Sequence, residues 1–374
     1  MLYYLSSLAP DSPLRLFHYI TLRGAGAAVT ALLLSVLLGP KVIEGLKELS
    51  FGQNYRDRAE IAGNLTGREP RKFGTPTMGG LLIVITLNIT TLLWAKWNLL
   101  VLLVLLTVAV LATLGFYDDY MKITKASGSG GAKSRVKLWV QGALALFIGI
   151  YAWKAPAMQH LNLISNIMVP FYKNPVATRF GLVGLIITVL TIVGSSNAVN
   201  LTDGLDGLAI GCTIIVSFVF LILTYVADRK DWSTYLQIPY VEGASELTVF
   251  CAGIIGAGLG FLWFNCHPAE VFMGDTGSLA LGGALGVMAV LIHQPLVLVI
   301  AGGVFVLEAV SVIIQTGYFK YTRNRYGTGQ RVFLMAPLHH HFEKKGWHES
   351  QVVMRFYILC ILFAVLALSS LKIR

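Results

Sequence analysis

The sequence predicts an all-α polytopic integral membrane protein, with about ten transmembrane helices in a single membrane domain that covers residues 1–374. Hydrophobic residues make up 55% of the chain and charged residues only 13%, whereas soluble domains carry about 25% charged residues. Apolar runs recur along the whole chain. None of them shows the alternating ten-residue pattern of a transmembrane β-barrel, so each is expected to form a helix.

Ten apolar segments follow one another along the chain. They cover Ala25–Ile43, Met78–Trp94, Leu99–Phe116, Leu138–Trp153, Phe180–Gly194, Leu208–Tyr225, Leu247–Phe264, Leu279–Ile292, Leu296–Tyr318 and Val352–Leu371. Several are shorter than the ~20 residues that a straight span needs, and His293-Gln294-Pro295 interrupts the chain at the end of the eighth. Residues 3–16 lack the basic start and the small-residue cleavage site of a signal peptide, so we expect them to be retained.

The charge bias predicts how these helices are oriented. An even number of spans places both termini on one side of the membrane and divides the loops into two sets. The loops near 46–75, 118–137, 195–207, 265–278 and 319–350 together hold 17 Lys and Arg residues, against ten in the termini and the alternate loops. Because basic loops tend to stay in the cytoplasm, we expect this set to face the cytoplasm and both termini to be periplasmic or otherwise extracytoplasmic.

Every unusual polar motif falls in the cytoplasmic set of loops. Phe116–Tyr120 closes the third apolar segment, Asn197–Asp206 joins the fifth and sixth, Phe272–Ser278 precedes the eighth, and Pro337–Phe342 lies between the ninth and tenth. These motifs include the aspartates Asp118, Asp119, Asp203, Asp206 and Asp275. Carboxylates are costly near a membrane and their oxygens are the ligands that hard cations prefer, so the convergence predicts a site for such a cation.

The second motif has a regular spacing. Asn197, Asn200, Asp203 and Asp206 recur every three residues, so a helical or 3₁₀ turn would align them on one face. Glycines that follow the two aspartates would let a ligand approach the backbone. The alternative is a capped turn in which Asp206 is the N-cap of the next helix, which would explain one acid but not the whole ladder.

The other two acidic motifs suggest different roles. Asp118 and Asp119 are adjacent, so on a helix they point about 100° apart and are not expected to chelate one ion together. One of them is expected to face the cavity as a base while the other anchors a lysine or a backbone group. Asp275 lies in a glycine-flanked turn before a helix, which suits a metal ligand and also suits an N-cap.

Basic residues are interleaved with these acids. Lys72 precedes the sequence Gly74–Gly80, and Lys122 and Lys137 follow the two adjacent aspartates. Most of the loop cations are expected at the membrane surface, where they set the topology, and a few beside the acids would suit a bound phosphate. The four cysteines form no C-x-x-C pair and are expected to be reduced packing residues.

Three consecutive histidines, His339, His340 and His341, admit three interpretations: a metal site, a surface tract, or hydrogen-bond donors to phosphate. No cysteine lies nearby to help bind a soft metal, so phosphate contact is a suitable role for one or two of them. Glu308 and Gln315, in the ninth segment, lie seven residues apart and share a helix face. An intramembrane glutamate is a functional candidate, and a buried structural contact is an equal alternative.

These motifs occur in an order that characterises a known family. The chain resembles the polyprenyl-phosphate N-acetylhexosamine-1-phosphate transferases through Thr75–Gly80, Asp118-Asp119, Asn200–Gly207, Gly274–Ser278 and Pro337–Phe342. The block His339–Phe342 resembles in particular the branch that acts on the muramoyl pentapeptide in bacterial cell-wall synthesis. The likeness covers essentially the whole chain.

The resemblance implies a reaction and a location. The muramoyl branch transfers phospho-MurNAc-pentapeptide from UDP-MurNAc-pentapeptide to undecaprenyl phosphate, giving lipid I and UMP in peptidoglycan synthesis, and it requires Mg²⁺. The implied protein is a multi-pass protein of the bacterial cytoplasmic (inner) membrane, with its active site facing the cytoplasm and a role in cell shape and cell division. Its partners would be the two substrates and membrane lipids, without nucleic acid, and a homodimer is left open.

The resemblance also implies roles for single residues. Asp275 would coordinate Mg²⁺, Asp118 would deprotonate or orient the lipid phosphate, and Asp119 would support the site. The uridine-diphosphate pocket would be lined by Lys72, Thr75, Asn200, Asp203, Asp206 and Asn265, with Phe272 stacked on the uracil. The phosphate or sugar would be contacted by His339 and His340, and the substrate-binding set is completed by Lys122, Lys137 and His341.

Two other functions compete with this one. A transferase of the same family for UDP-GlcNAc would share most of the motifs, and the block His339–Phe342 favours the muramoyl substrate. A divalent-cation transporter would place acids near the bilayer midplane, often within inverted repeats, whereas here they lie in loops amid Lys and Arg. Direct displacement is preferred over an enzyme-linked phosphate on Asp118, because Mg²⁺ and an ionised lipid phosphate already supply electrophile activation and nucleophile.

Overall fold

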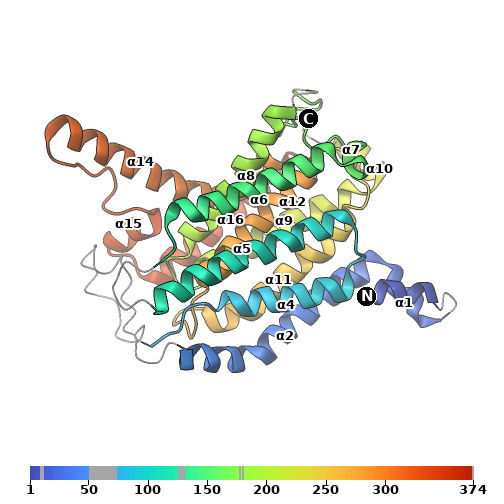
Figure 1. The fold of residues 1–374 in the computed structure, drawn as a ribbon, viewed down its shortest axis with the longest axis horizontal. Coiled ribbons are helices and arrows are strands. Elements are labelled where there is room, and N and C mark those ends of the chain that lie inside the picture. Colours follow the sequence, from blue (N-terminus) through green and yellow to red (C-terminus); the bar gives the residue numbers. More distant parts are fainter. Residues whose placement is uncertain (9–11, 50–73, 125–130, 177, 179–180, 373–374) are drawn as a thin grey trace.

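The computed structural model describes residues 1–374 except 9–11, 50–73, 125–130, 177, 179–180 and 373–374. Every regular element in the described part is a helix. The long helices form a bundle in which most axes run in one general direction, as Figure 1 shows. The predicted all-α membrane fold is therefore confirmed.

Helices occupy all ten predicted segments in the same order. They are α2 (Ile20–Leu49), α4 (Gly80–Trp94), α5 (Leu99–Thr124), α6 (Ser134–Lys154), α8 (Gly181–Thr202), α9 (Leu208–Ala227), α11 (Ser245–Asn265), α12 (Gly274–Leu291), α13 (Pro295–Ala301) with α14 (Gly303–Tyr326), and α16 (Glu349–Ser369). The shorter helices are α1 (Leu2–Leu8), η1 (Pro13–His18), α7 (Pro156–Gln159), α10 (Lys230–Leu236) and α15 (Leu338–Lys344). Within the described residues, nine helices are long and apolar enough to cross a membrane, and α4, with 15 residues, is shorter.

The ninth predicted segment is not one helix, so that prediction is wrong. The chain breaks at Gly302 between α13 and α14, where two successive glycines weaken a helix. Beyond the break, α14 leaves the bundle and projects from it at the left of Figure 1. The eighth segment, by contrast, is the uninterrupted 18-residue helix α12, and residues 292–294 separate it from α13, which begins at Pro295.

The most enclosed helices are α12 and α11. Helix α12 packs against α5 and α8, and α11 packs against α2 and α9. The apolar part of α12 is 89% buried, whereas that of α14 is 28% buried. Small residues allow this close packing: a methyl group at Gly282 of α12 would collide with the backbone of Ser195 in α8. The motif that begins α12 is therefore carried by the most enclosed helix of the bundle.

Both termini lie at one end of the bundle, on the right of Figure 1. The amino group of Met1 donates a hydrogen bond to the carbonyl of Leu92 at the end of α4. The backbone N–H of Lys372 donates to the carbonyl of Leu236 at the end of α10. This shared placement agrees with the even number of predicted spans. The compartment that this end faces stays a prediction from the charge bias.

Two helices continue past the predicted starts of the cytoplasmic loops. Asp118 and Asp119 lie within α5, which ends at Thr124. Asn197 and Asn200 lie within α8, which ends at Thr202. Polar residues can remain inside these helix ends because residues of the other motifs form hydrogen bonds and ion pairs with them, as the contacts of the site show.

Candidate active site

Three aspartates and two lysines meet where α5, α6 and α12 come together. The Nζ atom of Lys137 lies 2.7 Å from Oδ2 of Asp118 and 2.5 Å from Oδ2 of Asp275. The Nζ atom of Lys122 lies 2.6 Å from Oδ2 of Asp118 and 3.3 Å from Oδ1 of Asp275. One carboxylate oxygen each from Asp118, Asp119 and Asp275 lies within 4.8 Å of the other two. The structure thus unites five of the predicted site residues in one cluster, the Asp–Lys cluster.

Asp118 and Asp119 converge more than their adjacent positions on a helix suggest. Both are buried, and both offer an oxygen to the Asp–Lys cluster. Each also accepts backbone hydrogen bonds, Asp118 from Ala132 (2.7 Å) and Asp119 from Thr276 (3.0 Å). The hydroxyl of Thr276 donates to Asp119 as well (2.9 Å). The anchoring role expected of one aspartate therefore falls to both, and Asp119 holds the first turn of α12 beside Asp275.

The end of α8 contributes further polar groups to the start of α12. The side-chain amide of Asn200 donates to Oδ1 of Asp275 (2.8 Å) and to the hydroxyl of Ser278 (2.9 Å). Asp203 accepts the backbone N–H of Gly274 (3.1 Å). Removal from water, with repulsion from Asp275 and Asp119, raises the pKa of Asp203 to about 8. A cation bound at the cluster would oppose this shift.

The predicted ladder from Asn197 to Asp206 does not form one polar face. Asn197 donates to Oε1 of Gln141 in α6 (2.8 Å), whereas Asn200 and Asp203 turn to α12. The helix ends at Thr202, so the three-residue spacing no longer aligns side chains beyond it. The alternative reading of Asp206 as N-cap is also wrong, because Gly207 is the N-cap of α9 and no side chain caps that helix.

Asp206 belongs to a second polar group, together with His267 and Glu349. Its Oδ2 atom lies 3.1 Å from Nδ1 of His267, and its backbone N–H donates to Oε1 of Glu349 (2.9 Å). One ligand atom from each of the three residues lies within 4.8 Å of the others. Neither His267 nor Glu349 was expected beside Asp206. The only signals in the sequence were a histidine in the loop 265–278 and an acid three residues before the last apolar segment.

Asn265 joins two of the loops around the site. Its Oδ1 atom accepts the backbone N–H of Gly207 (3.1 Å), and its Nδ2 atom donates to the carbonyl of Val271 (2.8 Å). The side chain is buried. Asn265 therefore fixes the predicted nucleotide loops to each other, and its amide is already used by protein partners.

The segment before α4 pairs with the turn before α12. The backbone N–H of Phe272 donates to the carbonyl of Pro76 (2.9 Å), and that of Gly79 donates to the carbonyl of Phe272 (2.8 Å). The hydroxyl of Thr75 donates to the carbonyl of Ala269 (3.3 Å). Thr75 and Phe272 are partly exposed, so both have surface left for a ligand. Lys72 lies outside the described residues, and its role stays a prediction.

His339 is brought against the loop between α8 and α9. A methyl group at Gly204 would collide with its imidazole ring, so this approach requires glycine there. The backbone N–H of His339 donates to Oε1 of Glu308 (3.2 Å), and its Nδ1 atom lies 3.2 Å from the same oxygen. Both residues are buried. Glu308, whose role the sequence left open, therefore holds the histidine that faces the acidic loop.

The other two histidines have different partners. Nδ1 of His340 lies 2.7 Å from Oε2 of Glu343, and Nδ1 of His341 accepts the backbone N–H of Leu334 (3.1 Å). Burial and the charge of Lys345 lower the pKa of His341, which agrees with a neutral ring that accepts this bond. The ring of His339 lies against the loop that carries Asp203 and Asp206.

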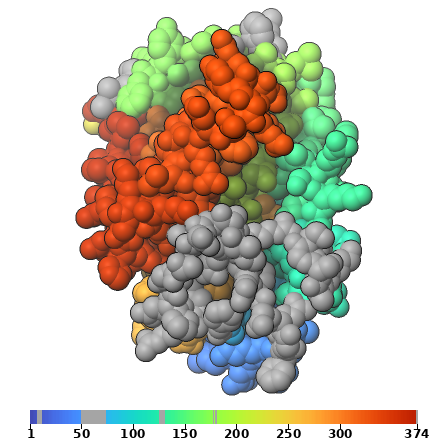
Figure 2. All heavy atoms as spheres, turned by 90° about the vertical axis from the view of Figure 1, so that its left-hand side faces the viewer, coloured from blue at the N-terminus to red at the C-terminus, as the bar shows by residue number. Residues whose placement is uncertain are grey.

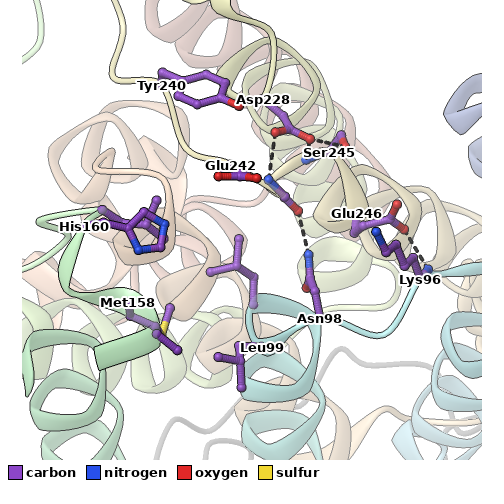
Figure 3. Close-up of a pocket in the computed structure, with 14 residues that line it drawn as sticks. Lys96, Asn98, Leu99, Met158, His160, Asp228, Tyr240, Glu242, Ser245 and Glu246 are labelled. Atoms are coloured by element: carbon purple, nitrogen blue, oxygen red, sulfur yellow. Dashed lines mark hydrogen bonds between the residues drawn. The ribbon is translucent and has the colours of Figure 1, made fainter. Parts of the chain in front are cut away.

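Figure 2 looks along the bundle onto the end of the molecule opposite the termini. A recess is visible between the projecting α14, in orange, and the teal segment of α5 and α6. Figure 3 shows a different pocket, of about 640 Å³, lined among others by Asp228, Tyr240 and Glu242. That pocket lies at the end that carries the termini, so it is separate from the Asp–Lys cluster.

A divalent cation fits the donors of the Asp–Lys cluster. Hard cations such as Mg²⁺ take oxygen ligands, and carboxylates are their usual protein donors. Three carboxylates face only two ammonium groups here, so with all five groups ionised one negative charge is left over. Asp275, with one of the two aspartates of α5, would hold the ion, and Lys122 and Lys137 would remain beside it to meet phosphate oxygens.

The fold and the site define a class of protein: a polytopic membrane protein with a carboxylate and lysine cluster suited to a metal-bound phosphate substrate. Residues 101–293 match the family described as glycosyl transferase family 4. The chain is 48% identical, over 100% of both chains, to the phospho-N-acetylmuramoyl-pentapeptide-transferase of Methylacidiphilum infernorum. It is 47% identical to that of Opitutus terrae (97% of this chain and 96% of the relative), and 48% to that of Desulfotalea psychrophila (96% and 95%).

The chain therefore belongs to the family of the phospho-N-acetylmuramoyl-pentapeptide-transferases. The resemblance drawn from the five motifs is confirmed, including the muramoyl branch that the histidine block indicated.

Proposed function

We propose that this protein transfers phospho-MurNAc-pentapeptide from UDP-MurNAc-pentapeptide to undecaprenyl phosphate, giving lipid I and UMP. The observation that carries the proposal is the Asp–Lys cluster, found in a chain that is 48% identical along its whole length to a transferase with that name. A lipid phosphate and a soluble nucleotide sugar can meet only at a membrane surface. The cluster lies at the end of the bundle where the motif loops converge, which suits such a meeting.

The reaction is a displacement at phosphorus. An oxygen of the lipid phosphate attacks the sugar-linked phosphorus of the diphosphate, and the bond to the UMP oxygen breaks as the new P–O bond forms. Both reactants are anionic, so their repulsion opposes the attack unless cations offset it. Lys122 and Lys137 carry two such charges into the cluster. When bound at Asp275, Mg²⁺ supplies a Lewis acid that polarises the diphosphate.

The remaining residues bind and orient the substrates. Asp118 orients the lipid phosphate or takes its proton, and Asp119 supports the site by fixing the start of α12 through Thr276. His339, whose ring lies beside the carboxylate of Glu308, contacts the phosphate or the sugar of the substrate. We assign the nucleotide to a pocket built from helix ends and loops, lined by Lys72, Thr75, Asn200, Asp203, Asp206, Asn265 and Phe272. Direct displacement, without a phosphorylated Asp118, is part of the proposal.

The location is part of the same proposal. The cluster would face the cytoplasm and both termini the opposite side of the bacterial inner membrane, as the family resemblance implies. The bias of Lys and Arg toward the motif loops supports this orientation.

The direct test is release of UMP by purified protein in detergent. The protein is given UDP-MurNAc-pentapeptide and undecaprenyl phosphate, with Mg²⁺ or with EDTA, and UDP-GlcNAc replaces the nucleotide sugar in a parallel reaction. We expect UMP only when both substrates and Mg²⁺ are present, and none from UDP-GlcNAc. Equal turnover of UDP-GlcNAc would refute the muramoyl assignment, and phosphate found on Asp118 after incubation with the nucleotide sugar alone would refute direct displacement.

A further inference from the structure

A cationic cavity lies at the end of the bundle that carries the termini, away from the Asp–Lys cluster. It has a volume of about 380 Å³ and is lined by parts of α1, η1, α2 and α11, by the end of α9, and by the turn between α4 and α5. It adjoins the pocket of Figure 3, with which it shares Lys96, Ser245 and Glu246. None of its residues belongs to the proposed transferase site.

The floor of the cavity is an ion pair whose carboxylate accepts three hydrogen bonds. Arg23 and Glu246 are both buried, and the guanidinium donates to both carboxylate oxygens, at 2.6 and 2.7 Å. The backbone N–H of Lys96 donates to Glu246 as well (2.7 Å). The Nε atom of Arg23 has no hydrogen-bond partner among the described residues. The floor is therefore neutral in sum, its acid is already neutralised by Arg23, and one buried donor is left over.

The rim of the cavity carries two positive charges without a carboxylate partner. The Nζ atom of Lys96 lies 5.3 Å from the ring centre of Tyr3, and Cζ of Arg229 lies 4.4 Å from that of Tyr225. Neither cation forms an ion pair with any carboxylate in the described part of the chain. The nearby acid Asp228 accepts hydrogen bonds from Gly243 and Ser245 and lines the adjoining pocket instead, as Figure 3 shows. An excess of about two positive charges thus faces the cavity.

The surroundings place the cavity at the level of lipid headgroups. Tyrosines line it, and aromatic contacts continue beside it between Phe17 and Trp94 and between Tyr4 and Trp97. Tyrosine and tryptophan gather at the boundary between hydrocarbon and water. Helix α2 runs from the cavity along the bundle, and its Leu22, Val29 and Leu33 are exposed and share one face. That face offers an apolar surface for acyl chains next to the cationic cavity.

We propose that this cavity binds the phosphate group of an anionic phospholipid, with Lys96 and Arg229 as its charged donors. A free phosphate ion would offer the same charge and oxygens. The lipid is favoured because its phosphate and its chains would meet the cations and the exposed face of α2 together.

The test measures lipid binding to the full-length protein in detergent. Short-chain phosphatidylglycerol, short-chain phosphatidylcholine and inorganic phosphate are titrated separately, and binding is read from native mass spectrometry and from the shift of the melting temperature. We expect phosphatidylglycerol to bind and to lose at least about tenfold in affinity when Lys96→Gln and Arg229→Gln are combined. Phosphatidylcholine and inorganic phosphate should bind at least tenfold more weakly to the unaltered protein.

Lys154→Gln is the matched control. Lys154 also lies over an aromatic ring, that of Trp153 (4.2 Å), at the same end of the bundle but outside the cavity. Its variant should bind phosphatidylglycerol like the unaltered protein. UMP release reports whether each variant is folded, because neither Lys96 nor Arg229 belongs to the transferase site, and Arg229→Gln alone serves if the double variant is inactive.

Three outcomes would overturn the proposal. Equal binding of phosphatidylcholine would remove the role of charge. Equal loss in the Lys154 variant would show general attraction to the surface. Binding of inorganic phosphate as tight as that of the lipid would make this a site for a soluble anion.

Discussion

The two ends of the helical bundle both bury charge, but one end buries a matched ion pair and the other buries more acids than cations. At the end with the termini, Arg23 meets Glu246 in a two-point ion pair whose carboxylate also accepts the backbone N–H of Lys96. At the other end, Asp118, Asp119 and Asp275 surround only two lysines. A matched pair carries no net charge that would attract an ion. An unmatched cluster costs stability and can bind a cation, which is the physical difference between a structural and a catalytic use of charge.

The largest effect is expected from removing Asp275, whose side chain is 13% exposed, against 1% for Asp118 and 3% for Asp119. Asp275→Ala takes away the proposed Mg²⁺ ligand, so turnover should fall by about 10³-fold or more, which corresponds to at least about 4 kcal/mol in the barrier. UMP release at saturating substrates measures it. Asp228→Ala, which alters an acid at the opposite end, should keep turnover within about threefold. If Asp228→Ala lost as much turnover as Asp275→Ala, the loss in Asp275→Ala would reflect a general effect on folding and not the removal of a metal ligand.

The next effect concerns a lysine of the cluster. Lys137→Gln removes a cation that contacts both Asp118 and Asp275, and we expect a loss of about 10²- to 10³-fold in kcat, as for other groups that offset charge in a transition state. Lys133→Gln changes an exposed lysine one turn earlier and should lose less than about twofold. Comparable kcat values for the two variants would show that Lys137 is only a surface charge.

A smaller effect is expected at the carboxylate behind His339. Glu308→Gln keeps an oxygen for the backbone N–H of His339 but removes the charge beside its Nδ1 atom. Turnover should fall by about tenfold, the equivalent of about 1.4 kcal/mol, with KM for the nucleotide sugar little changed. Ser311→Ala alters another buried polar residue of α14 and should be near neutral. If Glu308→Gln has full activity, the contact is structural, as the alternative reading of the sequence allowed.

The smallest effect on turnover is expected at the matched ion pair. Glu246→Gln leaves the buried Arg23 without its countercharge, so the variant should be less stable by about 3–5 kcal/mol, while turnover per folded molecule stays within about twofold. The melting temperature and UMP release measure the two effects. Glu242→Gln, an exposed acid close in sequence, should leave both unchanged. A large loss of turnover in folded Glu246→Gln would erase the contrast between the two ends.

Much of the site could be predicted from sequence because charged residues in apolar membrane segments are costly in free energy and are therefore candidates for function. Asp118, Asp119 and Asp275 stood out in apolar surroundings, and the structure brings them together. The spacing argument failed for Asn197 and Asp206, because α8 ends at Thr202 and side chains beyond a helix end no longer follow its period. Glu349 was missed because nothing in its local sequence distinguishes an acid that holds a distant backbone N–H from one at a helix start.

The sequence by itself determined the class of protein, the order of the apolar segments, and the residue types of the site. Those properties depend on composition and local periodicity, which each segment carries alone. Only the tertiary structure decided which charges meet: Lys137 reaches Asp275 across 138 residues, and Arg23 reaches Glu246 across 223. Each pair joins one cation to one acid, so the local sequence does not distinguish them. In the structure, Arg23 and Glu246 pair with each other, whereas Lys137 contacts both Asp118 and Asp275. The two pairs differ in how many opposite charges lie within a few ångströms of each cation. Helix packing decides that number.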